Sequence, residues 1–166
     1  MTKADYPITA AVRFLRAKRT AFEPHLYAYK ERGGTEHSAA ALGVPEHAVI
    51  KTLVMETDGR RPLIVLMHGD REVSTKTLAR VLEVKGVSPC DPAQAQKHTG
   101  YMVGGTSPFG VRKPMPVYAE KTIFDLPRIY VNGGKRGFLV SIDPKDLRVA
   151  LTLVEVEAAI APTDDD

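Results

Sequence analysis

The amino-acid sequence predicts a single α+β domain in which helices flank a mixed, largely antiparallel sheet that is curved and barrel-like. The chain has 166 residues, a length that fits one domain with a substantial hydrophobic core. Helical and extended patterns are interspersed along it, as in mixed folds. Neighbouring apolar runs separated by short turns predict β-hairpins, which argue against a repeated βαβ sheet.

The first elements of the chain are predicted to be a helix, a strand and a second helix. Thr9 can cap a helix over residues 9–19. The run 22–29 is extended in character, and a polar loop through Gly33-Gly34 leads to a short helix that ends at Gly43. The inward stripe of the first helix is formed by Ala11, Val12, Phe14 and Leu15.

A β-hairpin is the clearest prediction in the middle of the chain. The apolar runs 48–57 and 60–68 are joined by Asp58-Gly59, which favours a two-residue type I′ turn because both central residues need positive φ. Ser74 then caps a helix that is predicted to close at Gly86. The inward face of that helix is predicted to hold Leu78, Val81 and Leu82.

The second half of the chain is predicted to contain two more helices and two more strands. Asp91-Pro92 opens a helix that ends at Gly100, since proline at the first helical position loses no needed donor. A glycine- and proline-rich segment then spans 104–116. Strands are predicted over 128–132 and 138–142, followed by a helix that begins at Asp143-Pro144 and carries Leu147 and Leu151.

Composition limits the class of protein. The formal net charge is only +3, with an isoelectric point of about 9.0, a balance that many soluble enzymes share. There is no run of about 18 apolar residues, no secretory signal pattern, and only one cysteine, Cys90. A cytoplasmic protein without membrane contact is therefore expected. Residues 1–160 are predicted to form the domain and residues 161–166 an acidic tail.

Basic residues are grouped along the chain, and two interpretations of them stay open. The groups are Arg13, Arg16, Lys18 and Arg19, then Arg112 and Lys113, then Lys135 and Arg136. Such groups can bind a phosphate backbone through counterion release. They can equally be solvated helix faces and turns.

Lys51 is the most informative single residue in the sequence. The predicted strand around it is apolar on both faces, because Lys51 shares one face with Val49, Leu53 and Met55 while Ile50, Thr52 and Val54 occupy the other. An ammonium on such a strand must reach solvent, find a partner or face a functional cavity. The functional alternative is a fixed positive charge that holds a phosphate or a developing oxyanion.

Two glycine-rich segments are candidate ligand loops. The segment 100–110 allows close backbone approach, and its exposed amides could bind an anion, although its spacing matches neither a dinucleotide fingerprint nor a P-loop. The segment 133–137 places Lys135 and Arg136 among three glycines, which suits a phosphate-facing loop. In both cases a simple turn is the alternative.

The sequence gives no sign of a metal site or an activated nucleophile. The histidines at 25, 37, 47, 68 and 98 lack metal-ligand spacing, and there is no Gly-x-Ser-x-Gly elbow. Cys90, beside Pro89, is interpreted as an incidental thiol. No metal or cofactor is expected, and hydrolysis would depend on positioning and backbone amides more than on a side-chain base.

Three segments, in this order, resemble the YbaK/EbsC family and the related editing domain of prolyl-tRNA synthetase. They are Val49–Val54, Thr99–Gly110 and Ile129–Gly137, and the resemblance extends over nearly the whole chain. Val-Gly-Gly-x-Ser-Pro-x-Gly together with Gly-Gly-Lys-Arg-Gly is a specific combination. The resemblance implies the YbaK domain fold, with a curved and partly barrel-like sheet.

The resemblance also implies a set of site residues. The key strand lysine of the family corresponds to Lys51, and the amides of Gly104 and Gly105 would hold the carbonyl oxygen. The implied substrate-binding residues are Tyr27, chosen over Tyr29, with Thr106, Ser107, Pro108, Gly133, Gly134, Lys135, Arg136 and Gly137.

The implied activity is trans-editing, in which a deacylase cleaves the ester of a mischarged tRNA, here Cys-tRNA(Pro), with prolyl-tRNA synthetase as partner. In the cysteine-specific branch the substrate thiol attacks its own ester carbonyl and releases a thiolactone. The segment 30–37 matches no branch, so alanine, serine or threonine esters are alternative substrates. A non-catalytic tRNA- or nucleotide-binding module is the alternative from another class.

Overall fold

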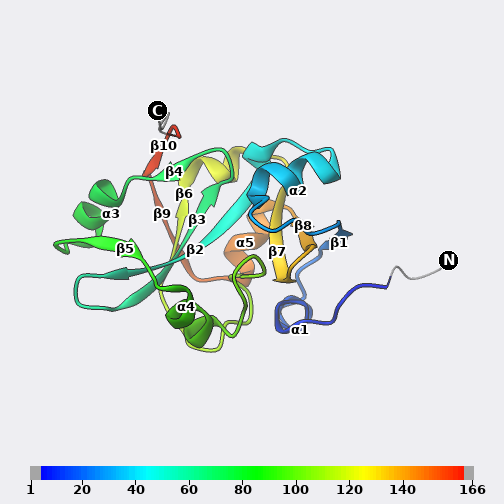
Figure 1. Ribbon diagram of the computed structural model, residues 1–166, viewed down its shortest axis with the longest axis horizontal. Helices are drawn as coiled ribbons and strands as arrows, with labels where there is room; N and C mark the ends of the chain where they lie inside the picture. The colour runs from blue at the N-terminus through cyan, green and yellow to red at the C-terminus, as the bar shows by residue number, and fades with distance from the viewer. Residues whose placement is uncertain (1–4, 163–166) are drawn as a thin grey trace.

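The computed structural model describes residues 5–162 and forms an α+β domain with one large sheet (Figure 1). The helices are α1 (Ala10–Ala17), α2 (Gly34–Leu42), α3 (Thr75–Leu82), α4 (Pro92–Thr99) and α5 (Pro144–Ala150), with 3-10 turns η1 (Glu46–Ala48) and η2 (Lys121–Asp125). The strands are β1 (Glu23–Leu26), β2 (Val49–Thr57), β3 (Pro62–His68), β4 (Glu72–Val73), β5 (Val87–Pro89), β6 (Val117–Glu120), β7 (Ile129–Lys135), β8 (Phe138–Ile142), β9 (Leu153–Val156) and β10 (Ala159–Ile160).

The large sheet has the strand order β1-β8-β7-β2-β3-β6-β9, and β5 pairs with a separate part of β2. The pairs β1–β8, β7–β8, β2–β3 and β2–β5 are antiparallel, whereas β2–β7, β3–β6 and β6–β9 are parallel. The α+β class and the mixed, largely antiparallel sheet are confirmed. The sheet is open, with β1 at one end and β9 at the other, so the described strands do not close into the predicted barrel-like form.

Capping residues explain most of the helix boundaries. The Thr9 hydroxyl accepts a hydrogen bond from the Val12 amide at 3.1 Å, and Ser74 accepts one from Thr77 at 3.2 Å. Pro92 and Pro144 stand at the first turns of α4 and α5. Gly43 and Gly100 end their helices in the left-handed conformation, as predicted.

The β2–β3 hairpin is confirmed, but its predicted turn type is wrong. The Arg60 amide donates to the Thr57 carbonyl at 2.8 Å, and the Thr57 amide donates to Arg61 at 3.0 Å. The residue with positive φ is Arg60, at 60°, and not Asp58 or Gly59. The connection is thus a three-residue loop that ends in a left-handed residue, the next commonest hairpin connection after the two-residue turn.

Helix α3 also differs from its prediction. It ends at Glu83, which adopts the left-handed conformation with φ 57°, three residues before Gly86. Val81 is 50% exposed, whereas Leu78 and Ala79 are buried. The buried face of α3 therefore contains Leu78 and the small Ala79 that follows it, and not Val81.

The predicted strand 22–29 is shorter than expected, because β1 pairs with β8 only from Glu23 to Leu26. Conversely, β7 extends into the predicted glycine turn as far as Lys135, with a register irregularity between Asn132 and Lys135. The short strands β4, β5, β6, β9 and β10 were not predicted, because segments of two to four residues carry too little alternation to detect.

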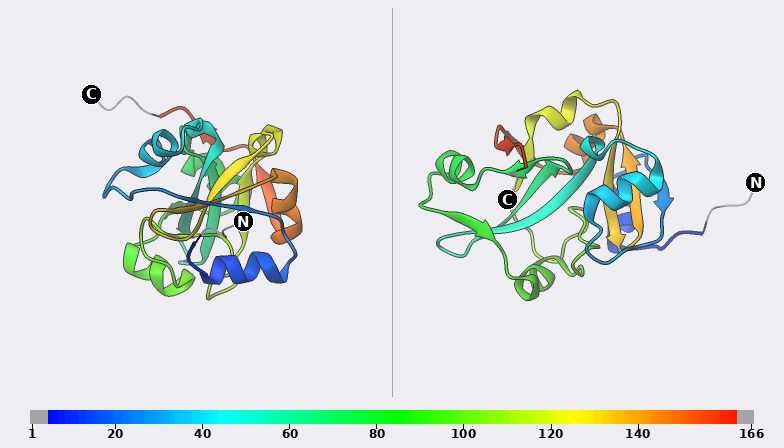
Figure 2. Two further views of the ribbon diagram at one scale, coloured as in Figure 1. Left: turned by 90° about the vertical axis from the view of Figure 1, so that its right-hand side faces the viewer. Right: turned by 45° about the horizontal axis from the view of Figure 1, so that its top comes forward.

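Helices cover both faces of the sheet (Figures 1 and 2). On one face, side chains of α1 and α5, such as Leu15 and Leu147, pack with Ile64 and Leu66 of β3. On the other face, α3 packs on Leu63 and Val65, and α2 packs on Val49 and Leu139. Alternate residues of β2 and β3 thus enter different cores, which explains why both strands are apolar on both faces.

No helix within residues 5–162 is long and apolar enough to cross a membrane. Of the predicted acidic tail 161–166, residues 163–166 lie outside the described residues.

Candidate functional site

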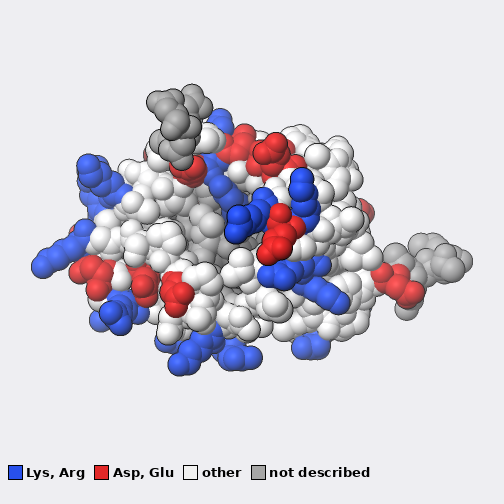
Figure 3. Space-filling model, in the orientation of Figure 1, with Lys and Arg blue, Asp and Glu red and all other residues white. Residues whose placement is uncertain are grey.

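A pocket of about 610 Å³ lies over the middle of β2. Five segments line it: 27–38 from the β1–α2 connection and α2, 49–54 of β2, the Cys90–Ala95 region, the loop 103–106, and the β7–β8 region with Asn132, Arg136 and Leu139. Figure 3, in the orientation of Figure 1, shows a hollow near the middle of the visible face, with Lys and Arg side chains along its border.

The pocket exists because the sheet separates at β2. On the side of β2 away from β3, strand β7 pairs only with Val49 and Ile50, while β5 pairs only with residues 55–57. The two strands diverge from β2 in Figure 1. Residues 51–54 therefore lie between them without a neighbouring strand on that edge, and all four line the pocket.

Lys51 lines this pocket and is half-buried. Its Nζ donates a hydrogen bond to the Arg71 carbonyl at 2.5 Å, and none of the ion pairs found within residues 5–162 includes it. Because an ammonium has three donors, two remain for a ligand. Burial lowers the pKa of Lys51, and the negative charges of Glu72, Glu46 and Asp70 oppose that shift without reversing it.

We expect Lys51 to lose its proton at a lower pH than an exposed lysine does. The folded pKa lies below the ordinary value of 10.5, so between these two pH values the unfolded chain binds more protons than the folded chain. The free energy of unfolding contributed by Lys51 should therefore rise with pH across that window. NMR titration of the Lys51 side chain in the folded and in the urea-unfolded chain would check this; coincident titration in the two states would contradict it.

The loop 102–106 is held against the β7–β8 turn by polar contacts. Asn132 Nδ2 donates to the Gly104 carbonyl at 3.1 Å, and Arg136 Nε donates to the Val103 carbonyl at 2.8 Å. The Gly105 amide donates to the Met102 carbonyl at 2.8 Å, so it is already used inside the loop. The Gly104 amide has no hydrogen-bond acceptor within residues 5–162. Of the two predicted carbonyl-binding amides, Gly104 is thus the one available to a ligand.

The predicted site residues divide into two groups. Those that line the pocket together are Tyr27, Lys51, Gly104, Thr106 and Arg136. Those that lie outside its lining are Gly105, Ser107, Pro108, Gly133, Gly134, Lys135 and Gly137. Members of the second group support the wall: Ser107 is fully buried and its hydroxyl accepts from the Phe109 amide at 3.2 Å.

Sequence reasoning preferred Tyr27 to Tyr29, yet both line the pocket. Tyr29 has closer contact with the glycine loop, since a Cβ on Gly104 would lie 2.6 Å from its hydroxyl, and the Arg136 guanidinium stacks over its ring at 5.2 Å. Burial raises the pKa of Tyr27, so its hydroxyl stays protonated. The unmatched segment 30–37 supplies much of one wall, through residues 30–32, 34, 35 and 37.

The pocket hydroxyls and thiol are not activated as nucleophiles. Burial and the carboxylate of Glu56 raise the pKa of the Cys90 thiol, which favours its less reactive protonated form. The Ser38 hydroxyl donates to the Thr35 carbonyl, and His37 Nε2 is hydrogen-bonded to the Ala28 carbonyl at 2.8 Å. In the described part of the chain, no serine, threonine or cysteine of this pocket is hydrogen-bonded to a histidine, and no cluster of potential metal ligands is found.

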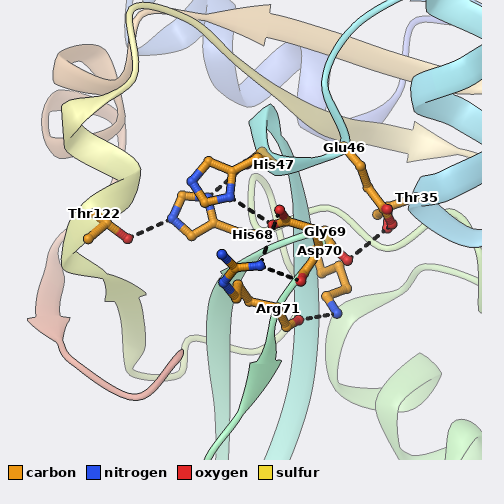
Figure 4. Close-up of polar contacts among 9 residues, drawn as sticks. Thr35, Glu46, His47, His68, Gly69, Asp70, Arg71 and Thr122 are labelled. Atoms are coloured by element: carbon orange, nitrogen blue, oxygen red, sulfur yellow. Dashed lines mark hydrogen bonds and ion pairs between the residues drawn. The ribbon is translucent and has the colours of Figure 1, made fainter. Parts of the chain in front are cut away.

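A smaller pocket of about 390 Å³ contains a stacked pair of histidines (Figure 4). The rings of His47 and His68 lie 3.7 Å apart and nearly parallel. His68 Nδ1 is 2.7 Å from the His47 carbonyl and Nε2 is 2.7 Å from the Thr122 hydroxyl. A carbonyl can only accept, so Nδ1 carries the proton and Thr122 donates to Nε2. This neutral imidazole agrees with burial lowering the pKa of His68.

The histidine pair is connected to Lys51 through the turn that follows β3. His47 Nδ1 is 2.7 Å from the Asp70 carboxylate (Figure 4). The next residue, Arg71, provides the carbonyl that accepts from Lys51. The Thr35 hydroxyl lies 3.2 Å from the Gly69 carbonyl of this turn and 2.7 Å from the Glu46 carboxylate of η1. The position of the Lys51 ammonium therefore depends on the turn 69–71.

Comparison with known proteins places this chain in a family. Residues 31–150 match the family described as the aminoacyl-tRNA editing domain. EbsC of Enterococcus faecalis, named as a Cys-tRNA(Pro)/Cys-tRNA(Cys) deacylase, is 28% identical over 138 residues, which cover 82% of this chain and 84% of EbsC. Proline–tRNA ligase of Desulfovibrio desulfuricans is 39% identical over 85 residues, or 51% of this chain and only 14% of the ligase.

A solved structure named as a trans-editing enzyme for prolyl tRNA synthetase has the same fold. Its TM-score is 0.80, and the match covers 95% of this chain and 100% of the other. The sequence identity is 18%, so this likeness concerns the fold alone.

Proposed function

The chain belongs to the family of aminoacyl-tRNA editing domains and is an aminoacyl-tRNA deacylase, and from this premise we propose that its substrate is Cys-tRNA(Pro). The likeness to EbsC over most of both chains supports cysteine as the amino acid. The likeness to a segment of proline–tRNA ligase supports tRNA(Pro) as the carrier. Prolyl-tRNA synthetase is then the proposed protein partner, which suits a chain whose net charge of +3 is small for unaided capture of tRNA.

One observation carries the proposed mechanism. The pocket combines a cation that has spare donors, Lys51, with an unused amide, Gly104, but holds no activated nucleophile in its described lining. Such a site can orient an ester and stabilise charge on its carbonyl oxygen. The attacking group must then come from water or from the substrate itself.

We infer that the substrate thiol is the nucleophile. Its sulfur bonds to the ester carbonyl carbon, the bond from that carbon to the ribose oxygen breaks, and the thiol proton ends on the ribose hydroxyl. The products are a cysteine thiolactone and free tRNA. Gly104 would hold the carbonyl oxygen, and Lys51 would orient the terminal ribose or its phosphate. Tyr27, Thr106 and Arg136 would form the remaining contacts.

Deacylation assays of Cys-tRNA(Pro), Ala-tRNA(Pro) and Pro-tRNA(Pro), with and without prolyl-tRNA synthetase, test this proposal. We expect cysteine alone to be released, initially as a thiolactone that mass spectrometry of the quenched products can detect before it hydrolyses. Release of alanine in place of cysteine would make an alanine ester the substrate. Absence of cleavage of any ester, with tRNA binding retained, would favour the non-catalytic binding module.

A further inference from the structure

The backbone of Thr52 faces the pocket along the interrupted edge of β2. Backbone groups of alternate residues in a strand point to the same edge. The Val54 carbonyl accepts from the Cys90 amide at 3.0 Å, and Glu56 pairs with Ser88 of β5, so the even-numbered residues point away from β3. The Val49 carbonyl accepts from the Gly69 amide and the Thr57 amide donates to the Arg61 carbonyl. Gly69 and Arg61 flank β3, so the odd-numbered residues of β2 point toward β3.

Thr52 is the even-numbered residue at the centre of the gap between β7 and β5. Neither its amide nor its carbonyl has a hydrogen-bond partner within residues 5–162. Its side-chain oxygen is also buried without a partner, a condition shared in that part of the chain only with Thr20. Unpaired backbone groups are rare in folded proteins, because they are costly unless water or a ligand satisfies them. The unpaired amide and carbonyl of this pocket residue therefore offer a donor and an acceptor to a polar ligand.

An aminoacyl ester has the complementary groups in the required order. Its α-ammonium is a donor and its ester carbonyl an acceptor, separated by one carbon, as are the amide and carbonyl of a strand residue. A strand edge binds such a group by exchanging two hydrogen bonds, as in an antiparallel pair. The carbonyl oxygen has two lone pairs, so it can also accept from Gly104.

We propose that the aminoacyl group binds to Thr52 as a one-residue strand, in the gap between β7 and β5. The Thr52 carbonyl accepts from the substrate α-ammonium, and the Thr52 amide donates to the ester carbonyl. This inference rests on the proposed function. It makes Thr52 the residue that recognises the α-amino group and the ester carbonyl of the substrate, whatever the substrate's side chain. Binding in this way also places the ester carbonyl between the amides of Thr52 and Gly104.

The substrate side of the proposal is tested with 3-mercaptopropionyl-tRNA(Pro), which keeps the thiol and the ester but lacks the α-amino group. Each enzymatic rate is divided by the uncatalysed rate, because the amino group itself activates the ester. We expect a loss of about 10–100-fold relative to Cys-tRNA(Pro), the range for a hydrogen bond to a charged group. Equal cleavage of the two esters would overturn the inference and leave the proposed function intact. Cleavage of neither would count against the proposed function instead.

The enzyme side is tested by replacing Thr52 in the full chain with its α-hydroxy acid, which exchanges the amide N–H for an ester oxygen. We expect kcat/KM for Cys-tRNA(Pro) to fall about tenfold or more. Tm should fall only slightly, because the lost N–H has no partner in the protein and the exchange merely weakens the Lys51 carbonyl as an acceptor in the ladder with β3. The matched control is the same replacement at Met55, which pairs with Leu63 and lies outside the pocket lining. That replacement should lower Tm and leave kcat/KM unchanged. The opposite pattern would overturn the proposal.

Discussion

Lys51→Ala is expected to lower kcat/KM for the proposed Cys-tRNA(Pro) substrate by about 10²-fold, because the ammonium is proposed to orient the terminal ribose or its phosphate and a misplacement of about 1 Å costs a factor of that size. The ammonium has one internal bond, to the Arg71 carbonyl, so its removal should cost the fold about 1 kcal/mol, or a few degrees in Tm. Single-turnover deacylation and thermal unfolding measure the two effects separately.

Lys76→Ala is the control for this variant. Lys76 is exposed on α3, away from the pocket lining, so the same loss of charge there should leave turnover and Tm unchanged. A loss below tenfold for Lys51→Ala, with tRNA binding intact, would show that the ammonium is not needed for the reaction. A loss of tRNA affinity alone, with kcat retained at saturating tRNA, would assign Lys51 to substrate binding and not to the reaction.

Gly105→Ala is expected to damage both stability and activity. A Cβ at this position would lie 2.9 Å from the Arg136 amide nitrogen and 3.0 Å from the Lys135 carbonyl carbon. These are backbone atoms of the β7–β8 turn and cannot rotate away, so the loop 102–106 must shift. We expect the free energy of unfolding to fall by about 1–3 kcal/mol. Displacing the wall by an ångström should lower kcat/KM by about 10²-fold.

Gly86→Ala provides the comparison for Gly105→Ala. No atom lies within 4 Å of a Cβ at Gly86, and its φ is not positive. Alanine there should be neutral or should stabilise the protein by about 0.4–1 kcal/mol, because it restricts the unfolded chain. Urea unfolding gives both free energies. Equal stability of the two variants would mean that the loop relaxes without cost.

Sequence reasoning predicted the elements whose signals are local. Thr9, Ser74 and Asp143 each cap the helix that follows, because capping depends on residues only two or three positions apart. The hairpin of β2 and β3 was predicted because both strands are long and apolar. Its turn type was not, because the left-handed position went to Arg60, and the favourable Asp58-Gly59 pair did not decide the loop length.

The site was predicted only in part, because its shape depends on contacts between distant segments. Lys51 stood out as a charge on an apolar strand, but no local pattern shows that β7 and β5 leave a gap beside it. The use of the Gly105 amide within its own loop, and the contact of Tyr29 with Gly104, likewise arise only when the chain folds. Thr52 carries no signal at all in the sequence, since threonine is common in strands.

The wall contributed by residues 30–38 has a consequence for how such proteins diversify. This segment lines the pocket, but in α2 only Ser38 and Ala39 are buried. Its exposed members, such as Lys30 and Arg32, take no part in the hydrophobic clusters that hold the sheet together. We expect substitutions among them to alter which amino acid is accepted while leaving the stability of the domain almost untouched. Under the proposed function, selection on the substrate and selection on folding would then act on separate parts of the chain.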